Sequence, residues 1–266
     1  MRVATLNLHA GVDGWGRPTR AVKHALELDA DVLILPELWR GDFGPDLFDE
    51  LRRRGGYEGV FAPLAHAERN TSGAPGRRWQ PVLAHLNGER GLFFQEHRRL
   101  TRAQQRTRAA ATNLEPGQWG LGVVTRLPIE ETRVFPLGRL RRERVTRALV
   151  LARVTGGAGS FWVAGVHGAH LSHGSRHQYR VIGRYLDALE PPLPTLLGGD
   201  FNAWGPVLRV ILPGWHSLVR ARTWPARRPH SQIDHLFARG PWRVTKGFAR
   251  DVGSDHRALV ADLELN

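Results

Sequence analysis

The sequence has 266 residues, of which 41% are hydrophobic, and its formal net charge at pH 7 is +13. It contains no cysteine, which excludes disulfide bonds, thiolate catalysis and cysteine-ligated zinc. No run approaches the roughly 20 apolar residues of a membrane span, and the N-terminus leads into a strand-like pattern instead of a signal sequence, so we expect cytoplasm as the default location.

Apolar periodicity indicates alternating strands and helices in the first part of the chain. Short continuous apolar runs are typical of buried strands, whereas apolar residues that recur about every 3.6 positions indicate helices. The predicted elements are strands at residues 3–8, 31–35 and 57–61, with helices at residues 19–28 and 45–54. Pro36 is expected to end the second strand.

The sequence then becomes polar and rich in arginine, from about residue 62 to residue 118. We interpret this segment as a surface insertion in a single domain that spans the whole chain. A helix is predicted at residues 101–113. If this stretch is helical, Arg98, Arg102 and Arg106 share one face and form a cationic stripe.

Regular strand and helix patterns return after the insertion. Strands of both the buried and the alternating type occur, mixed with helices, which indicates two packed mixed β-sheets flanked by helices. The predicted fold class is therefore a four-layer α/β sandwich. The predicted elements are strands at residues 120–124, 147–154, 160–166, 195–197, 233–238 and 258–263, and a helix at residues 175–189.

Acidic, amide and histidine side chains stand near the ends of these predicted strands. Ligands of α/β sheets gather at strand ends, so these side chains could converge in one cleft. Carboxylate and amide oxygens suit Mg²⁺ or Mn²⁺, which also bind substrate phosphate. The candidate residues are Asn7, Glu37, His170, Asp200, Asn202, Asp234, Asp255 and His256.

Short motifs around these residues occur in a fixed order. They are Thr5-Leu6-Asn7-Leu8, Leu35-Pro36-Glu37, Gly122 to Ile129, Gly168-Ala169-His170-Leu171, Gly199-Asp200-Phe201-Asn202, Gln232-Ile233-Asp234-His235 and Ser254-Asp255-His256. Together they resemble the endonuclease/exonuclease/phosphatase superfamily, whose deoxyribonuclease-like members are metal-dependent phosphohydrolases. The Gly-Asp-Phe-Asn motif is a full match, whereas Pro36 stands where the family usually has glutamine.

The resemblance implies a role for each oxygen-bearing side chain. Glu37 should hold the Mg²⁺ or Mn²⁺ ion. Asn7 and Asp255 should be further metal ligands, directly or through water. Asp200 and Asn202 should orient the attacking water. The chain is thus expected to be a metal-dependent hydrolase of phosphate esters.

The resemblance also implies roles for the cationic side chains. His256, supported by Asp234, should act as a general base or polarise the phosphate. His170 should serve as an acid or as a phosphate contact, and Arg147 should bind the substrate phosphate. Histidine suits proton transfer near neutral pH because its reference pKa is about 6.5.

Two further groups of residues could bind ligands. Trp39 and Trp204 lie two positions after Glu37 and Asn202, so they could stack on a substrate. Four histidines have the spacing of zinc ligands on a helix, but the glycines among them favour a loop. These are His167, His170, His173 and His177.

The leading functional interpretation is a nuclease. Nearly all of the excess positive charge is arginine, whose planar guanidinium pairs with phosphate, so nucleic acid is the expected partner. The alternative is the same chemistry on a lipid, as in a sphingomyelinase, or on a small phosphate ester. A non-catalytic binding module on the same fold is a minor alternative. No protein partner is implied.

Overall fold

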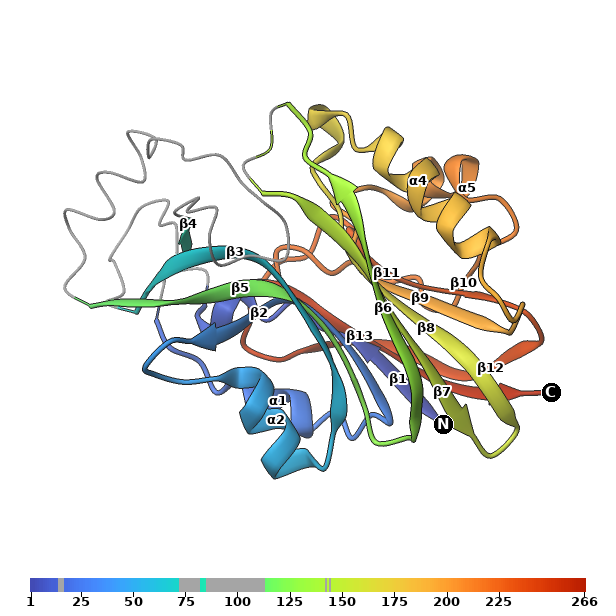
Figure 1. The fold of residues 1–266 in the computed structure, drawn as a ribbon, viewed down its shortest axis with the longest axis horizontal. Helices are drawn as coiled ribbons and strands as arrows, with labels where there is room; N and C mark the ends of the chain where they lie inside the picture. Colours follow the sequence, from blue (N-terminus) through green and yellow to red (C-terminus); the bar gives the residue numbers. More distant parts are fainter. Residues whose placement is uncertain (14–16, 72–81, 85–112, 142, 144) are drawn as a thin grey trace.

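The computed structural model describes residues 1–13, 17–71, 82–84, 113–141, 143 and 145–266. Within them two β-sheets pack face to face, and helices cover the outer face of each sheet (Figure 1). Each sheet contains one parallel pair, β1 with β2 and β8 with β9, among antiparallel neighbours. The predicted four-layer α/β sandwich of two mixed sheets is confirmed.

The first sheet has seven described strands in the order β12-β13-β1-β2-β5-β3-β4. The central strands β1 and β2 are almost completely buried, as their continuous apolar sequences predict. The bounds are β1 Arg2–Thr5, β2 Val32–Gly41, β3 Glu58–Asn70, β4 Val82–Ala84, β5 Leu114–Thr125, β12 Trp242–Asp251 and β13 Arg257–Leu265.

The second sheet has six described strands in the order β10-β11-β9-β8-β7-β6. Its strands β8 and β9 run parallel, with His167 opposite Asp200, and β11 pairs antiparallel with β9, with Asp234 opposite Asp200. The bounds are β6 Ile129–Gly138, β7 Arg147–Gly156, β8 Gly159–His167, β9 Thr195–Asp200, β10 His216–Ser217 and β11 Asp234–Arg239.

The helices lie on the two outer faces. Helices α1 (Ala21–Leu26) and α2 (Leu47–Gly55) cover the first sheet, and α4 (Arg176–Asp187) and α5 (Gly205–Ile211) cover the second (Figure 1). Asp46 caps α2 by accepting a hydrogen bond of 2.9 Å from the backbone N–H of Asp49. Short 3₁₀ turns occur at His9–Gly11 (η1) and Leu171–His173 (η2).

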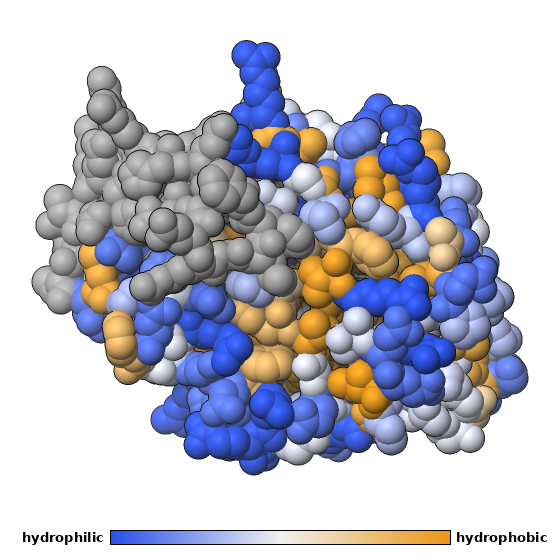
Figure 2. Space-filling model, in the orientation of Figure 1, coloured by the Kyte–Doolittle hydropathy of each residue, from blue (hydrophilic) through white to orange (hydrophobic). Residues whose placement is uncertain are grey.

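Two hydrophobic clusters hold these layers together. The larger one fills the space between the sheets and extends under α1 and α2, whereas the second lies between α4, α5 and the outer face of the second sheet. On the face in view, hydrophilic residues cover the lower edge near α1 and α2, and hydrophobic residues reach the surface mainly near the middle (Figure 2). Of the helices that the structure describes, none has the length and apolar character that a membrane span requires.

The structure differs from the sequence-based prediction in the length of several strands. Strand β2 continues through Pro36 to Gly41, so the prediction that Pro36 ends it was wrong. Proline is tolerated there because a β-bulge between Pro36 and Leu38 interrupts regular pairing with β5. Strand β3 likewise extends to Asn70 and β5 begins at Leu114, inside the segment interpreted as an insertion. The cationic stripe and, except for Asn113, the predicted helix at 101–113 lie outside the described residues.

Candidate active site

The polar residues predicted from the strand ends meet where the carboxyl ends of the two parallel pairs come together. Glu37 comes from the first sheet, and His167 and Asp200 come from the ends of β8 and β9 in the second. Asp234 begins β11, and His256 immediately precedes β13. Such a junction is the usual ligand-binding edge of an α/β fold.

Glu37 has a backbone conformation that is unusual for its residue type. It lies in the bulge of β2 with a φ of 55°, and the left-handed conformation costs a non-glycine residue about 1–2 kcal/mol. Its Oε1 accepts a hydrogen bond of 3.0 Å from Nδ2 of Asn7, and its Oε2 accepts one of 3.3 Å from Nε1 of Trp119. Strain of this kind is concentrated at functional sites, where surrounding contacts hold it.

Asp200 is positioned by the backbone of its own motif. A Cβ at Gly199 would overlap the carbonyl oxygen of Val166 on the parallel strand β8, so only glycine fits there. Oδ1 of Asp200 accepts a hydrogen bond of 2.8 Å from the backbone N–H of Asn202, and Oδ2 accepts one of 3.1 Å from Asn7. Burial and the nearby Asp234 carboxylate raise the pKa of Asp200 to about 7.

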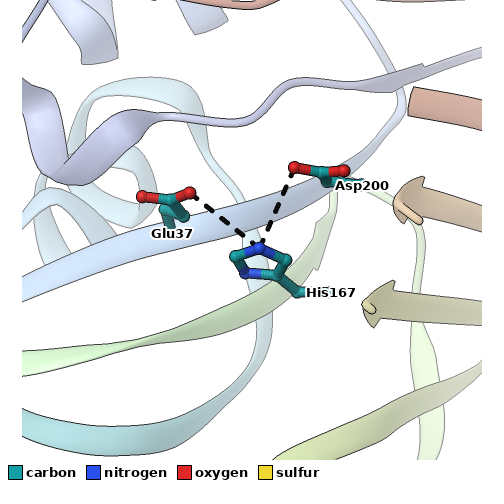
Figure 3. Close-up of side chains that lie close together, drawn as sticks. All are labelled: Glu37, His167 and Asp200. Carbon is teal, nitrogen blue, oxygen red and sulfur yellow. Dashed lines mark ion pairs between the residues drawn. The ribbon is translucent and has the colours of Figure 1, made fainter. Parts of the chain in front are cut away.

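His167 faces the two carboxylates across the junction (Figure 3). Its Nε2 lies 3.9 Å from Oε1 of Glu37 and 3.8 Å from Oδ2 of Asp200. Burial and the Arg147 charge hold the pKa of His167 well below its usual value, so this imidazole is neutral at neutral pH. A neutral imidazole presents a lone pair that can accept a proton or bind a metal.

His256 is held by a carboxylate on its other side. Its Nδ1 lies 2.8 Å from Oδ2 of Asp234, and its Nε2 lies 3.9 Å from Oδ2 of Asp200. Burial alone would lower the pKa of His256, but the carboxylates of Asp234 and Asp255 raise it well above its usual value. The imidazolium is therefore the favoured form in this arrangement.

Asn7 and Asp255 border the same group. Asn7 donates to both Glu37 and Asp200, while its side-chain oxygen accepts a hydrogen bond of 2.9 Å from the backbone N–H of His9. Oδ1 of Asp255 lies 3.6 Å from Nδ1 of His9. Asn7 thus links the two carboxylates, and Asp255 lies at the edge of the group.

The donor set fits a hard divalent cation. Two groups of possible ligand atoms each lie within 4.8 Å of one another: Glu37 with His167 and Asp200, and Asp200 with Asp234 and His256. Three carboxylates in so small a volume repel one another unless positive charge is supplied. Carboxylate oxygens are the ligands that Mg²⁺ and Mn²⁺ prefer.

Arg147 lies beside this centre with part of its guanidinium unpaired. Its side chain is buried, and Nη2 donates a hydrogen bond of 3.0 Å to Oε2 of Glu143. Among the described residues, Nε and Nη1 have no hydrogen-bond partner. The guanidinium lies 5.6 Å from the ring centre of Trp119, which also contacts Glu37 and His167.

Other predicted site residues lie apart from the two groups. His170 is exposed, and its Nδ1 lies 2.9 Å from the hydroxyl of Ser172. Trp39 is fully buried in the core, which excludes stacking on a substrate, whereas Trp204 is 57% exposed. The four histidines considered as zinc ligands are spread over β8, a loop, η2 and α4.

Sequence reasoning considered His167 only as a possible zinc ligand and missed Glu143. A signal for His167 was present, since it is the last residue of a predicted strand that runs beside the strand of Asp200. Glu143 precedes Arg147 by four positions in an irregular segment and belongs to no recognisable motif.

A sequence profile of the Endonuclease/Exonuclease/phosphatase family matches residues 4–256. No curated protein matches the chain.

Among solved structures, the chain is similar to an endonuclease/exonuclease/phosphatase from Beutenbergia cavernae, with 20% identity and a TM-score of 0.65 over 100% of this chain and 72% of that one. It is also similar to the catalytic domain of human Nocturnin, with 16% identity and a TM-score of 0.63 over 100% and 94% of the two chains. A mannosyl-6-phosphatase from Bacteroides thetaiotaomicron has 13% identity and a TM-score of 0.63 over 100% of both chains. At these identities the likeness concerns the fold.

Proposed function

Because the chain belongs to the endonuclease/exonuclease/phosphatase family, we propose that it is a Mg²⁺- or Mn²⁺-dependent phosphodiesterase that cleaves nucleic acid. Members of this family are generally phosphoric ester hydrolases. The observation that carries the proposal is the largely buried group of Glu37, Asp200 and Asp234 with two histidines, next to the unpaired N–H groups of Arg147. Hydrolysis of a phosphodiester needs both an acidic metal site and cationic donors for the phosphate.

In this proposal Glu37 and Asp200 would hold the ion, with Asn7 and Asp255 contributing at the edge of the site. When bound, the ion supplies Lewis-acid chemistry and neutralises charge on the phosphate oxygens. Asn202 directs its backbone N–H to Asp200, which fixes the carboxylate beside the position where water would attack. Proximity and orientation of this kind lower the barrier without any change in the reacting groups.

Two histidines and Arg147 contact the substrate phosphate in this proposal. His256, held by Asp234, provides a positive charge and an N–H for the phosphate. We assign the phosphate-contact role predicted for His170 to His167, because His167 is the one that faces Glu37 and Asp200. The acid role does not suit His167, because its imidazole is neutral at neutral pH. Arg147 binds a non-bridging phosphate oxygen through its free N–H groups.

Nucleic acid is the favoured substrate class because the chain carries a net charge of +13 that is mostly arginine. A polyanionic strand releases counterions when cationic side chains contact its phosphates, so its cleavage should weaken steeply as salt rises. A small or lipid phosphate ester would show little of this dependence.

The test is a substrate screen with the purified chain in Mg²⁺, in Mn²⁺ and in EDTA. The substrates are plasmid DNA, single-stranded DNA and RNA oligonucleotides, bis(4-nitrophenyl) phosphate, 4-nitrophenyl phosphate and sphingomyelin vesicles, with Asp200→Asn as the inactive control. We expect metal-dependent cleavage of a nucleic acid and of the chromogenic diester. Turnover of the monoester or of sphingomyelin without cleavage of any nucleic acid would reject the proposal in favour of the corresponding alternative.

A further inference from the structure

A cavity of about 600 Å³ is lined by residues that are close in sequence to Asn202 and Asp234, and it has no part in the proposed chemistry. It is bounded by α5, by β10 and by the segment that leads into β11. Its lining includes aromatic and arginine side chains, namely Trp204, Arg209, Trp215, Arg220, Arg222 and Phe237. We call it the Trp204 pocket.

The Trp204 pocket and the catalytic group share their supporting segments. Trp204 lies two residues after Asn202, and Gln232, another lining residue, lies two residues before Asp234. His235 follows Asp234 on β11 and points to the opposite face of the sheet, where its Nε2 lies 2.9 Å from the carbonyl oxygen of Ala203. The pocket therefore lies on the face of the second sheet opposite to the face from which Asp234 projects.

The charged residues that line the pocket are all basic, and none of the lining residues is acidic. Arg209, Arg220 and Arg222 are exposed, and within the described part of the chain no ion pair joins any of them to a carboxylate. Like charges that share a cavity repel one another, and an anion relieves that repulsion. The planar guanidinium fork matches phosphate oxygens in particular.

The apolar part of the pocket is aromatic. Trp204 is 57% exposed, which is unusual for so large an apolar side chain, and its indole lies on the pocket wall. Trp215 lies deeper and is buried, and the guanidinium of Arg239 lies 4.9 Å from its ring centre. An exposed indole beside unpaired arginines suits a ligand that joins a flat ring to a phosphate.

We infer that the Trp204 pocket binds a nucleotide of the substrate strand that lies outside the scissile phosphodiester. The base of this nucleotide stacks on Trp204, and its phosphates contact Arg220 and Arg222. The inference rests on the proposed nuclease function and adds the site that distinguishes a strand from a small phosphate ester. Loops on a rigid scaffold commonly supply such selectivity, while the catalytic residues stay on the sheets.

The test compares Trp204→Ala and the double variant Arg220→Gln/Arg222→Gln with a matched control, Arg227→Gln/Arg228→Gln. The control removes two exposed arginines from the same segment that do not line the pocket. Each protein is assayed on a single-stranded oligonucleotide and on bis(4-nitrophenyl) phosphate, which is too small to reach both sites. Binding of a fluorescent oligonucleotide is also measured in the Asp200→Asn background, so that affinity is read without turnover.

We expect both pocket variants to lose about tenfold or more in kcat/KM and in affinity for the oligonucleotide, the scale of one stacked base or a lost phosphate contact. The double variant should also make the slope of log affinity against log salt shallower by about 1.4, since each phosphate on a single strand contributes about 0.7. Rates on the chromogenic diester should stay unchanged.

If the wild-type protein cleaves the oligonucleotide and the pocket variants behave like the control, the inference is overturned and the proposed function stands. If the wild-type protein hydrolyses only the chromogenic diester and cleaves no oligonucleotide, the nuclease proposal fails and the inference falls with it. Equal losses on both substrates would mean that the pocket supports the catalytic centre, which also overturns the inference.

Discussion

Nδ1 of His256 lies 2.8 Å from Oδ2 of Asp234, and both side chains are buried. This contact fixes the orientation of the imidazole and directs its other nitrogen toward Asp200, 3.9 Å away. A carboxylate in this position fixes the orientation of the imidazole and stabilises its positive charge. Asp234 and His256 therefore act as a pair, and we expect the loss of either side chain to lower activity to a similar extent.

Asp234→Asn should lower kcat by a factor of at least about 100, because the amide no longer stabilises the charged imidazole of His256. The pKa of His256, measured by NMR titration, should fall in the same variant. His256→Ala should have a similar effect on kcat, and the double variant should be no worse than either single one. Asp187→Asn, at an exposed carboxylate on α4, is the control. Nearly normal turnover in Asp234→Asn with saturating metal would show that the pair has no catalytic part.

His167→Gln should lower kcat by about 100-fold or more, whereas His170→Gln should change it by less than about threefold. The reason is that His167 faces Glu37 and Asp200, while His170 is exposed and contacts Ser172. Thermal melting of both variants checks that the buried substitution has left the fold intact. The opposite ranking of the two variants would return the catalytic role to His170.

Glu37→Gln should abolish metal-dependent activity, since the amide keeps the size of the side chain but removes the charge that holds a hard cation. Mg²⁺ should raise the melting temperature of the wild-type protein, because an ion that binds only the folded state stabilises it. This shift should be absent in Glu37→Gln and retained in Glu58→Gln, an exposed carboxylate on β3. Full wild-type activity in excess EDTA would rule out the metal assignment.

Glu143→Gln should destabilise the protein at pH 6 by on the order of 1–3 kcal/mol, because a buried arginine loses its charged partner. Burial raises the pKa of Glu143, but Arg147 and His173 lower it more, so the pKa in the folded protein lies below the reference value of 4.5. The ionised carboxylate of Glu143 therefore stabilises the fold at pH values above this reference pKa. The stabilisation is lost as the pH falls through the pKa that Glu143 has in the folded protein.

Urea unfolding at pH 6 and at pH 3.5 measures this effect. The difference in unfolding free energy between wild type and Glu143→Gln should shrink at the lower pH. The variant should also have a higher KM for the oligonucleotide, since Arg147 is no longer held at the centre. A difference that is constant between the two pH values would mean that Glu143 does not act through its charge.

The motifs predicted most of the candidate site because they stand at strand ends, and a sheet brings strand ends together. Asp200 and Asp234 are paired in the second sheet for this reason, and the packing of the two sheets brings His256, which precedes β13, to them. The sequence analysis placed His170, and not His167, beside the carboxylates. The motif can be aligned with either histidine, and only the pairing of β8 with β9 shows that His167 lies opposite Asp200.

Other features could not be read from the sequence for physical reasons. Pro36 normally ends a strand, and nothing local shows that a bulge after it lets β2 continue. The Trp204 pocket is built by α5, β10 and the segment before β11, none of which has a strong periodic pattern. Long-range packing, which local propensity does not encode, creates both features.

The left-handed backbone conformation of Glu37 lowers the stability of the fold, whereas its carboxylate is needed for the proposed activity. Glycine adopts this conformation without steric cost, so Glu37→Gly should relieve strain of about 1–2 kcal/mol and the repulsion among the three carboxylates. The gain is reduced by the greater freedom of glycine in the unfolded chain and by the loss of the hydrogen bonds from Asn7 and Trp119. We expect the net effect to be a higher unfolding temperature. The same change would remove the carboxylate at the centre of the proposed metal site. A search for thermostable variants would therefore favour inactive proteins here, and an engineered form of this chain should keep Glu37 and seek its added stability elsewhere.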